Sequence, residues 1–230
     1  MNDERDEEPG KIVHEIRTGE VARLGLTPFA RYYGTVDAPP LFLCVLCEHA
    51  EWTGELDLFR ELLPQVEAAL TWIDRYGDLD GDGLIEYRRR APGGLRNQGW
   101  KDSEDGVVDE RGRPLEPPIA MVEAQAYVVR AKLALSRLYQ LSGQGERGDQ
   151  LAAEAEALSR RLEAFWLADE GFYAMALDGD KRPSRALASK ARRPSIEGNR
   201  MSCAMGASQS MPRAAPGGPA MAPCARCSLP

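Results

Sequence analysis

The chain has 230 residues and a formal net charge of −7. This length allows a sizeable core, built as one large domain or two small ones. The acidic balance argues against nucleic acid and against an anionic membrane surface as partners.

Residues 1–9 are strongly acidic, whereas a secretory signal peptide begins with basic residues and continues with apolar ones. We expect this acidic segment to be disordered. No apolar run in the chain reaches the roughly 20 residues that a membrane-spanning helix needs. These features predict a cytoplasmic protein.

Residues 10–24 form a short amphipathic segment, and a loop over residues 25–34 follows. The next helix is predicted to begin after Asp37, a plausible N-cap residue, and to end near Trp52. Its sequence is apolar almost all round, which predicts a buried helix.

Three further segments follow with helical patterns. Apolar residues three and four positions apart over residues 56–73 predict an amphipathic outer helix. Residues 118–141 predict a mostly apolar helix. After a turn over residues 143–148, a second amphipathic helix extends to Phe165.

The two halves of this pattern are alike. Each has a buried helix, a turn with glycine, an amphipathic helix and an extended segment, at residues 83–87 and 171–175. Repeated hairpins of this kind predict an all-α toroid of inner and outer helices, whose long polar loops build a pocket at one end. An ordinary helical bundle is the alternative.

The loop over residues 94–105 (GLRNQGWKDSED) is the leading candidate for a functional site. Trp100 can stack on the apolar face of a sugar ring while neighbouring polar groups bind the hydroxyls. Asp102, between Lys101 and Ser103, is placed to protonate a leaving oxygen. The alternative is a solvated acidic loop in which Trp100 only contacts the core.

Glycoside hydrolysis needs a second carboxyl group, and the candidates are Asp37, Glu86 and Glu123. Glu123 and Gln125 lie on an otherwise apolar helix, where buried polar groups need partners. Those partners are either a bound sugar or a hydrogen-bond network within the core.

Two motifs suggest metals. The run DLDGDG over residues 78–83 resembles the start of an EF-hand calcium loop, but its twelfth position is Arg89 instead of Glu. A tight acidic turn is the alternative. Cys44 and Cys47 have CxxC spacing in an apolar helix, and neither His14 nor His49 lies near a second CxxC pair, which favours two buried thiols over zinc. We expect neither a metal nor a cofactor.

Residues 190–230 differ sharply in composition from the rest of the chain. They hold six basic residues and one acidic residue, are rich in Ala, Pro, Gly, Ser and Arg, and contain no aromatic residue. We expect this low-complexity tail to be disordered, or to be the product of a shifted reading frame.

Four segments together carry a resemblance to a known family: RYYGTVDAPPLF at 31–42, DGDGLIEY at 80–87, NQGWKDS at 97–103 and VEAQAY at 122–127. Residues 10–189 thereby resemble part of the catalytic domain of bacterial amylo-α-1,6-glucosidase (glycogen debranching) proteins. These are similar to other six-hairpin glycosidases, including mannosylglycerate hydrolases. The resemblance implies an (α/α)6 toroid and inverting hydrolysis of α-glucans or small glucosides without a metal-dependent step.

The resemblance also implies roles for individual residues. Asp102 matches the family's general acid, and Asp37 matches an aspartate that lines the sugar site. Tyr33, Trp100 and Lys101 would line the pocket beside them. Glu123 and Gln125 remain further candidates for binding an oligosaccharide or glucoside substrate.

Two departures from the family matter. Its general base is a Glu beyond the matched residues, and its N-terminal β-rich domain is missing. The resemblance therefore implies about half a toroid, inactive alone, whose exposed apolar helices favour self-association. A non-catalytic sugar-binding module and a helical-hairpin scaffold are the alternatives. A terpene-cyclase-like toroid is disfavoured because no helix carries an Asp-rich metal motif.

Overall fold

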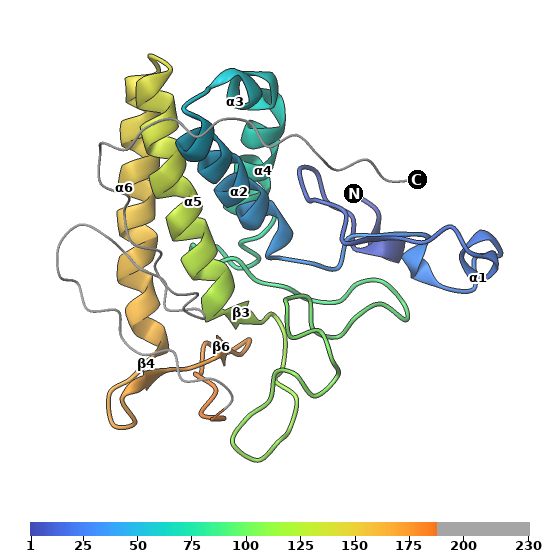
Figure 1. Cartoon of the computed structure of the whole chain (residues 1–230). Helices are drawn as coiled ribbons and strands as arrows, with labels where there is room; N and C mark the ends of the chain where they lie inside the picture. Colours follow the sequence, from blue (N-terminus) through green and yellow to red (C-terminus); the bar gives the residue numbers. More distant parts are fainter. Residues whose placement is uncertain (188–230) are drawn as a thin grey trace, which may run out of the picture. The chain divides into compact units, whose positions relative to one another are not determined.

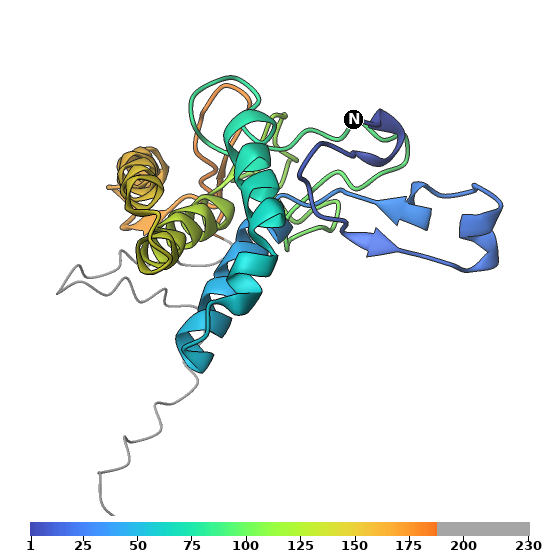
Figure 2. The same ribbon diagram turned by 90° about the horizontal axis from the view of Figure 1, so that it is seen from above.

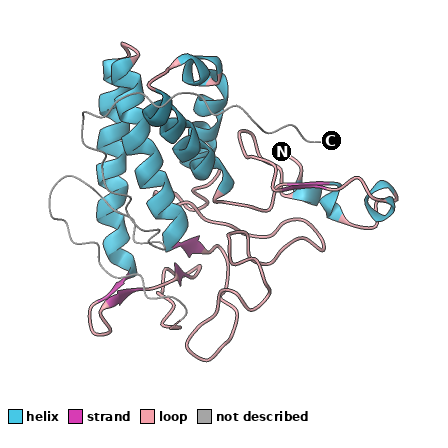
Figure 3. Ribbon diagram, in the orientation of Figure 1, coloured by secondary structure: helices cyan, strands magenta, loops and turns pink. Residues whose placement is uncertain are grey.

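The computed structural model describes residues 1–187, and this part of the chain is largely helical (Figures 1 and 3). The predicted tail, residues 190–230, and the last two residues of the matched segment 10–189 therefore lie outside the described residues. The helices are α1 (Glu20–Arg23), α2 (Ala38–Thr53), α3 (Asp57–Glu61), α4 (Leu63–Arg75), α5 (Val122–Leu141) and α6 (Gly145–Arg161). Three 3-10 helices add η1 (Asp3–Arg5), η2 (Pro28–Ala30) and η3 (Leu162–Phe165).

Helix α2 begins after Asp37 and ends at Gly54, as predicted. Gly54 has φ +74°, a left-handed conformation that favours glycine at the end of a helix. The prediction that the whole helix is buried is wrong, because one side of it carries exposed apolar residues. These are Leu41, Val45 and Trp52, with Trp52 89% exposed. The opposite side packs against α4 and α5.

The single helix predicted over residues 56–73 is two helices, α3 and α4, which meet at Leu62. Pro64 lies in the first turn of α4. Proline has no backbone N–H to donate to the carbonyl four residues earlier, which explains why the first helix does not continue. The amphipathic pattern is confirmed within α4, whose buried residues are Val66, Ala69, Leu70, Trp72 and Ile73.

Helices α5 and α6 form a hairpin along their whole length (Figure 1). The turn predicted over residues 143–148 is shorter, since α6 already begins at Gly145. A Cβ atom on Gly148 would lie 2.7 Å from the Ser136 carbonyl oxygen, so glycine permits the close approach of α6 to α5. Leu151, Ala155 and Leu158 form the predicted buried stripe of α6.

Within residues 1–187, six two-residue strands pair antiparallel in three two-stranded sheets. They are β1 (Glu15–Ile16) with β2 (Arg31–Tyr32), β3 (Ala120–Met121) with β6 (Ala176–Leu177), and β4 (Trp166–Leu167) with β5 (Phe172–Tyr173). The β1–β2 hairpin extends away from the helices (Figure 2). The β3–β6 pair matters most for the site, because it fixes the start of α5.

The N-terminal segment, expected to be disordered, is ordered and partly buried. The Asp6 carboxylate accepts hydrogen bonds from the backbone N–H groups of Arg90 (2.7 Å) and Ala91 (3.1 Å). Glu8 accepts one from the indole of Trp72 at 2.8 Å. The acidic composition misled the prediction because these carboxylates are used as buried hydrogen-bond acceptors.

One apolar core joins the helices. Its largest fully buried side chains include Trp72, Tyr139, Phe59, Phe165, Leu43 and Leu135. Within residues 1–187, none of the helices combines the length and apolar character required to cross a membrane.

Candidate functional site

The loop over residues 94–105 is shaped from within by a buried amide, that of Asn97. This side chain accepts a hydrogen bond from Tyr87 Oη at 3.0 Å and donates one to the Ser103 carbonyl oxygen at 2.6 Å. The second bond closes the backbone around residues 100–102. The Asn97 amide therefore stabilises the loop, and Trp100, Lys101 and Asp102 lie in the segment that it closes.

Gln98 connects the same loop to two distant segments. Its backbone carbonyl accepts a hydrogen bond from Val36 N at 2.8 Å, and its side chain donates to Asp6 Oδ2 at 3.0 Å. The same carboxylate oxygen accepts a bond from Tyr32 Oη at 2.9 Å. Sequence reasoning missed the role of Asp6, since nothing in a run of acidic residues distinguishes the buried one.

Gly99 brings the loop against Asp37 and the start of α5. A Cβ atom on Gly99 would lie 2.4 Å from Met121 Sδ and 3.8 Å from Asp37 Oδ2. Asp37 is buried, and its Oδ1 accepts a hydrogen bond from Thr35 Oγ1 at 2.9 Å. Although it is the N-cap residue of α2, its side chain makes no capping bond. Asp37 thus lies beside Gly99.

The three residues after Gly99 lie toward solvent. The Trp100 side chain is 54% exposed, with Lys101 Nζ 5.0 Å from its ring centroid. The Lys101 ammonium also lies 3.2 Å from Met175 Sδ, next to β6. Asp102 is exposed and makes neither a hydrogen bond nor an ion pair with another described residue. Trp100, Lys101 and Asp102 are therefore consecutive residues on a loop that the buried side chains of Asn97 and Gln98 hold in place.

The two polar residues predicted on α5 have different environments. Gln125 is buried, exchanges two hydrogen bonds with the backbone of Ile85 (2.9 and 2.6 Å) and donates to the Met121 carbonyl at 3.2 Å. This is the core network left open as an alternative. Glu123 differs, because its Oε2 is buried and has no hydrogen-bond partner among the described residues. That oxygen can accept a hydrogen bond from a bound group.

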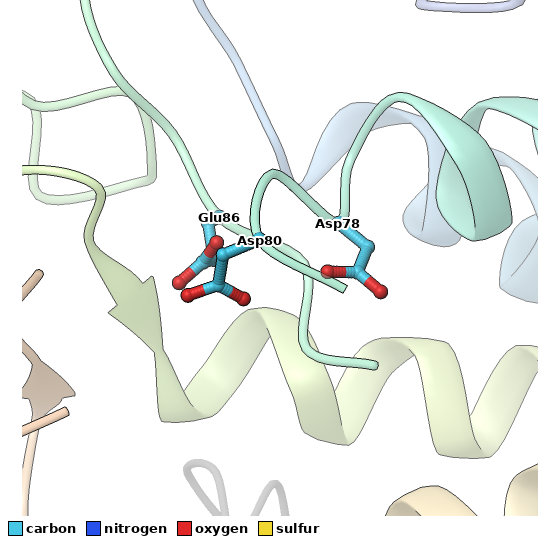
Figure 4. Close-up of side chains that lie close together, drawn as sticks. All are labelled: Asp78, Asp80 and Glu86. Atoms are coloured by element: carbon cyan, nitrogen blue, oxygen red, sulfur yellow. The ribbon is translucent and has the colours of Figure 1, made fainter. Parts of the chain in front are cut away.

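The remaining two predicted residues lie at other places. Tyr33 is half-buried, and its backbone N–H donates to the Arg5 carbonyl at 3.0 Å. Glu86 is buried beside Asp80 and forms an ion pair with Lys181 (Figure 4). Burial raises the pKa of Glu86, and Lys181 acts against that rise. Glu86 therefore belongs to the acidic loop after α4, where the EF-hand-like motif lies.

A cavity of about 400 Å³ lies between α4, α5 and α6, away from the loop over residues 94–105. Its charged lining residues are Asp74, Asp78, Lys132, Glu154 and Arg161. Lys132 is committed to ion pairs with Asp74 (2.5 Å) and Glu154 (2.7 Å). This cavity does not contain the residues predicted to act on a substrate.

No protein-family model matches the sequence, and a comparison with curated proteins finds no significant match. Functional proposals for the chain therefore depend on its motifs and on the arrangement of the loop over residues 94–105.

Proposed function

We propose that this chain forms the sugar-binding and general-acid part of an inverting glycoside hydrolase that acts on α-glucans or small glucosides. The observation that carries the proposal is the packing at Gly99, the residue before the exposed Trp100, where a Cβ atom would lie 3.8 Å from Oδ2 of the buried Asp37. An aromatic face beside a fixed carboxylate suits a pyranose, which offers apolar C–H groups on one face and hydroxyls at its edge. The motif resemblance supports the same assignment.

In this proposal a sugar ring stacks on Trp100, and its hydroxyls bind Asp37 and Lys101. The unpartnered Oε2 of Glu123 is a further acceptor for a hydroxyl on the α5 side. Asp102 donates its proton to the glycosidic oxygen as the bond from that oxygen to the anomeric carbon breaks. A water molecule, deprotonated by a second carboxylate, forms the new bond from the opposite face of the sugar.

In the family that the motifs resemble, the second carboxylate is a Glu that lies beyond the part matched by residues 10–189. Among the candidates in the described part, Glu86 is engaged with Lys181 and Asp37 with Thr35. We therefore propose that this chain alone does not hydrolyse glycosides.

The proposed fold is part of an (α/α)6 toroid. The two hairpins, formed by α2 with α3 and α4 and by α5 with α6, are compatible with consecutive units of such a ring. The exposed apolar side of α2 supports this proposal, because Leu41, Val45 and Trp52 would be covered by further inner helices. In their absence the same side favours self-association.

A sugar-binding module without catalysis is the second candidate. It is favoured by the surroundings of Asp102, which is exposed and lacks a hydrogen bond or ion pair within residues 1–187. A general acid is usually held by burial or by a neighbouring charge that keeps its proton available at neutral pH. In this reading Trp100 and Asp37 still bind a sugar, and Asp102 has no chemical role.

Titration of the chain with maltotetraose by calorimetry tests the shared claim. We expect Asp37→Asn to weaken binding about tenfold, because it removes a charge-assisted acceptor for sugar hydroxyls. Asp102→Asn should bind as tightly as the parent chain. Absence of any saturable heat with the parent chain would contradict both readings and favour a structural scaffold.

A further inference from the structure

The loop that follows α4 gathers four carboxylates. Asp78, Asp80 and Asp82 lie in the loop, and Glu86 lies just after it. One carboxylate oxygen from each of Asp78, Asp80 and Glu86 lies within 4.8 Å of the other two. Figure 4 shows these three side chains. The Asp82 carboxylate joins them through a shared contact, the ammonium of Lys181, which lies 2.7 Å from Asp82 Oδ2.

Lys181 belongs to the segment after β6, about a hundred residues away in sequence. Its ammonium also lies 2.9 Å from Asp80 Oδ2 and forms an ion pair with Glu86. Within residues 1–187, it is the single Lys or Arg side chain paired with any of the four carboxylates. One positive charge therefore faces four ionisable acids, which leaves a formal charge of −3 when all are ionised.

Glu86 distinguishes this cluster from an ordinary acidic turn. Its side chain is fully buried, and its Oε2 has no hydrogen-bond partner among the described residues. A buried carboxylate oxygen without a partner is costly unless a proton or a cation satisfies it. Figure 4 shows the Glu86 carboxylate lying next to that of Asp80, so this buried carboxylate belongs to the cluster. Burial also raises the pKa of Glu86.

The register of these side chains matches a calcium loop in an unexpected way. With Asp78 in the first position, Asp80 and Asp82 take the third and fifth, and Gly83 takes the sixth with φ +83°. The twelfth position, Arg89, lacks the usual Glu. Glu86 occupies the ninth position and supplies the buried carboxylate instead. Calcium prefers such oxygen ligands and tolerates irregular geometry.

We propose that residues 78–86 bind a calcium ion, which displaces the ammonium of Lys181 from Asp80, Asp82 and Glu86. Lys181 then acts as the internal counter-ion of the calcium-free state. The exchange replaces one charge by two and leaves Lys181 free to enter water. This site is independent of the proposed sugar site, because it shares none of the residues Asp37, Trp100 and Asp102.

Calorimetric titration of the chelator-treated full chain with CaCl2 at pH 7 tests this proposal. The parent chain should bind one calcium ion with a Kd of about 0.1–1 mM, a weak site because Lys181 competes. Lys181→Met should tighten binding about fivefold, since the competing ammonium is gone. Glu86→Gln and Asp80→Asn should each weaken it at least about tenfold.

Asp57→Asn is the matched control, because Asp57 is an exposed acid on α3 whose partner is Arg60. Its calcium binding should equal that of the parent chain. The half-exposed Asp80 keeps the test valid if Glu86→Gln does not fold. The proposal is overturned if the parent chain binds no calcium, even if Lys181→Met does, or if the two acidic-loop variants bind as well as the parent. The cluster would then be an ion-pair network only.

Discussion

The side chain of Gln98 donates a hydrogen bond to Asp6 Oδ2 at 3.0 Å, although 92 positions separate the two residues. This contact connects the N-terminal segment to the loop that presents Trp100. Asp6 also accepts hydrogen bonds from Tyr32 Oη and from the backbone N–H groups of Arg90 and Ala91. One buried carboxylate therefore holds three segments in place. The conformation of the proposed sugar site therefore depends on Asp6, a residue that is not proposed to bind the sugar.

Replacing Asp6 with Ala should destabilise the chain by about 2–4 kcal/mol, since several buried donors lose their acceptor at once. Urea unfolding measures this as a lower free energy of unfolding. Asp3→Ala is the control, because the Asp3 side chain is 69% exposed and lies 3.7 Å from its ion-pair partner Arg90. Equal effects of the two substitutions would mean that Asp6 does not hold the segments together.

Gly99→Ala should cost about 1–3 kcal/mol of stability, because the added methyl group meets Met121 Sδ at 2.4 Å. It should also displace Trp100 and weaken maltotetraose binding. The second substitution Met121→Ala should restore part of both losses. Gly19→Ala, where a Cβ atom meets nothing within 4 Å, should leave stability and binding almost unchanged. If Gly99→Ala is equally harmless, the packing at Gly99 does not position the site.

Cys47 gives a prediction for alkaline pH. Burial raises the pKa of its thiol from 9.0 to about 12, with smaller contributions from Cys44 and nearby acids. The folded chain thus keeps the proton that the unfolded chain loses near pH 9. The free energy of unfolding should therefore fall as pH rises from about 9 toward 12, by about 1.4 kcal/mol for each pH unit at most.

Cys47→Ala removes this contribution, so its unfolding free energy should decline less steeply above pH 9 than that of the parent chain. Between pH 7 and 8 the Cys47 thiol is protonated in both the folded and the unfolded chain. The unfolding free energies of the parent chain and of Cys47→Ala should therefore change with pH at the same rate there. Parallel curves over the whole range from pH 7 to 11 would show that Cys47 does not keep its proton in the folded state.

Local signals in the sequence predicted a large part of the helical framework. Asp37 and the apolar run up to Trp52 identified α2, and the amphipathic patterns identified the buried stripes of α4 and α6. Pro64 is a signal for a break between two helices. The apolar pattern continues across it, however, so the sequence analysis predicts one helix. The exposure of α2 could not be predicted, because it depends on which helices surround it.

The sequence indicated the exposed residues of the candidate site, but not the buried residues that hold the loop in place, such as Asp6. Trp100, Lys101 and Asp102 were singled out by their chemistry, and the packing of Gly99 against Asp37 joins two motifs far apart in sequence. Gln125 could equally have been a ligand or a core residue, and only its bonds to Ile85 distinguish the two. Glu86 was considered for catalysis, yet it lies with Lys181, a contact that requires the fold.

The chain alone should not release sugar from aryl α-glucosides faster than its Asp102→Asn variant does. The physical reason is that inversion needs a base that activates water, and in the family that the motifs resemble this base lies beyond the part matched by residues 10–189. Release of the aryl alcohol, followed by absorbance, measures this. Turnover that disappears in Asp102→Asn would show that the base lies within this chain.

The measurement that tests the central claim most directly compares the two exposed tryptophans. Trp100→Ala and Trp52→Ala each remove an accessible indole, but only Trp100 lies on the loop beside Asp37. With maltotetraose, Trp100→Ala should lose at least about tenfold in affinity, and Trp52→Ala should bind like the parent chain. Equal affinities of all three proteins, or a loss confined to Trp52→Ala, would contradict a sugar site at this loop.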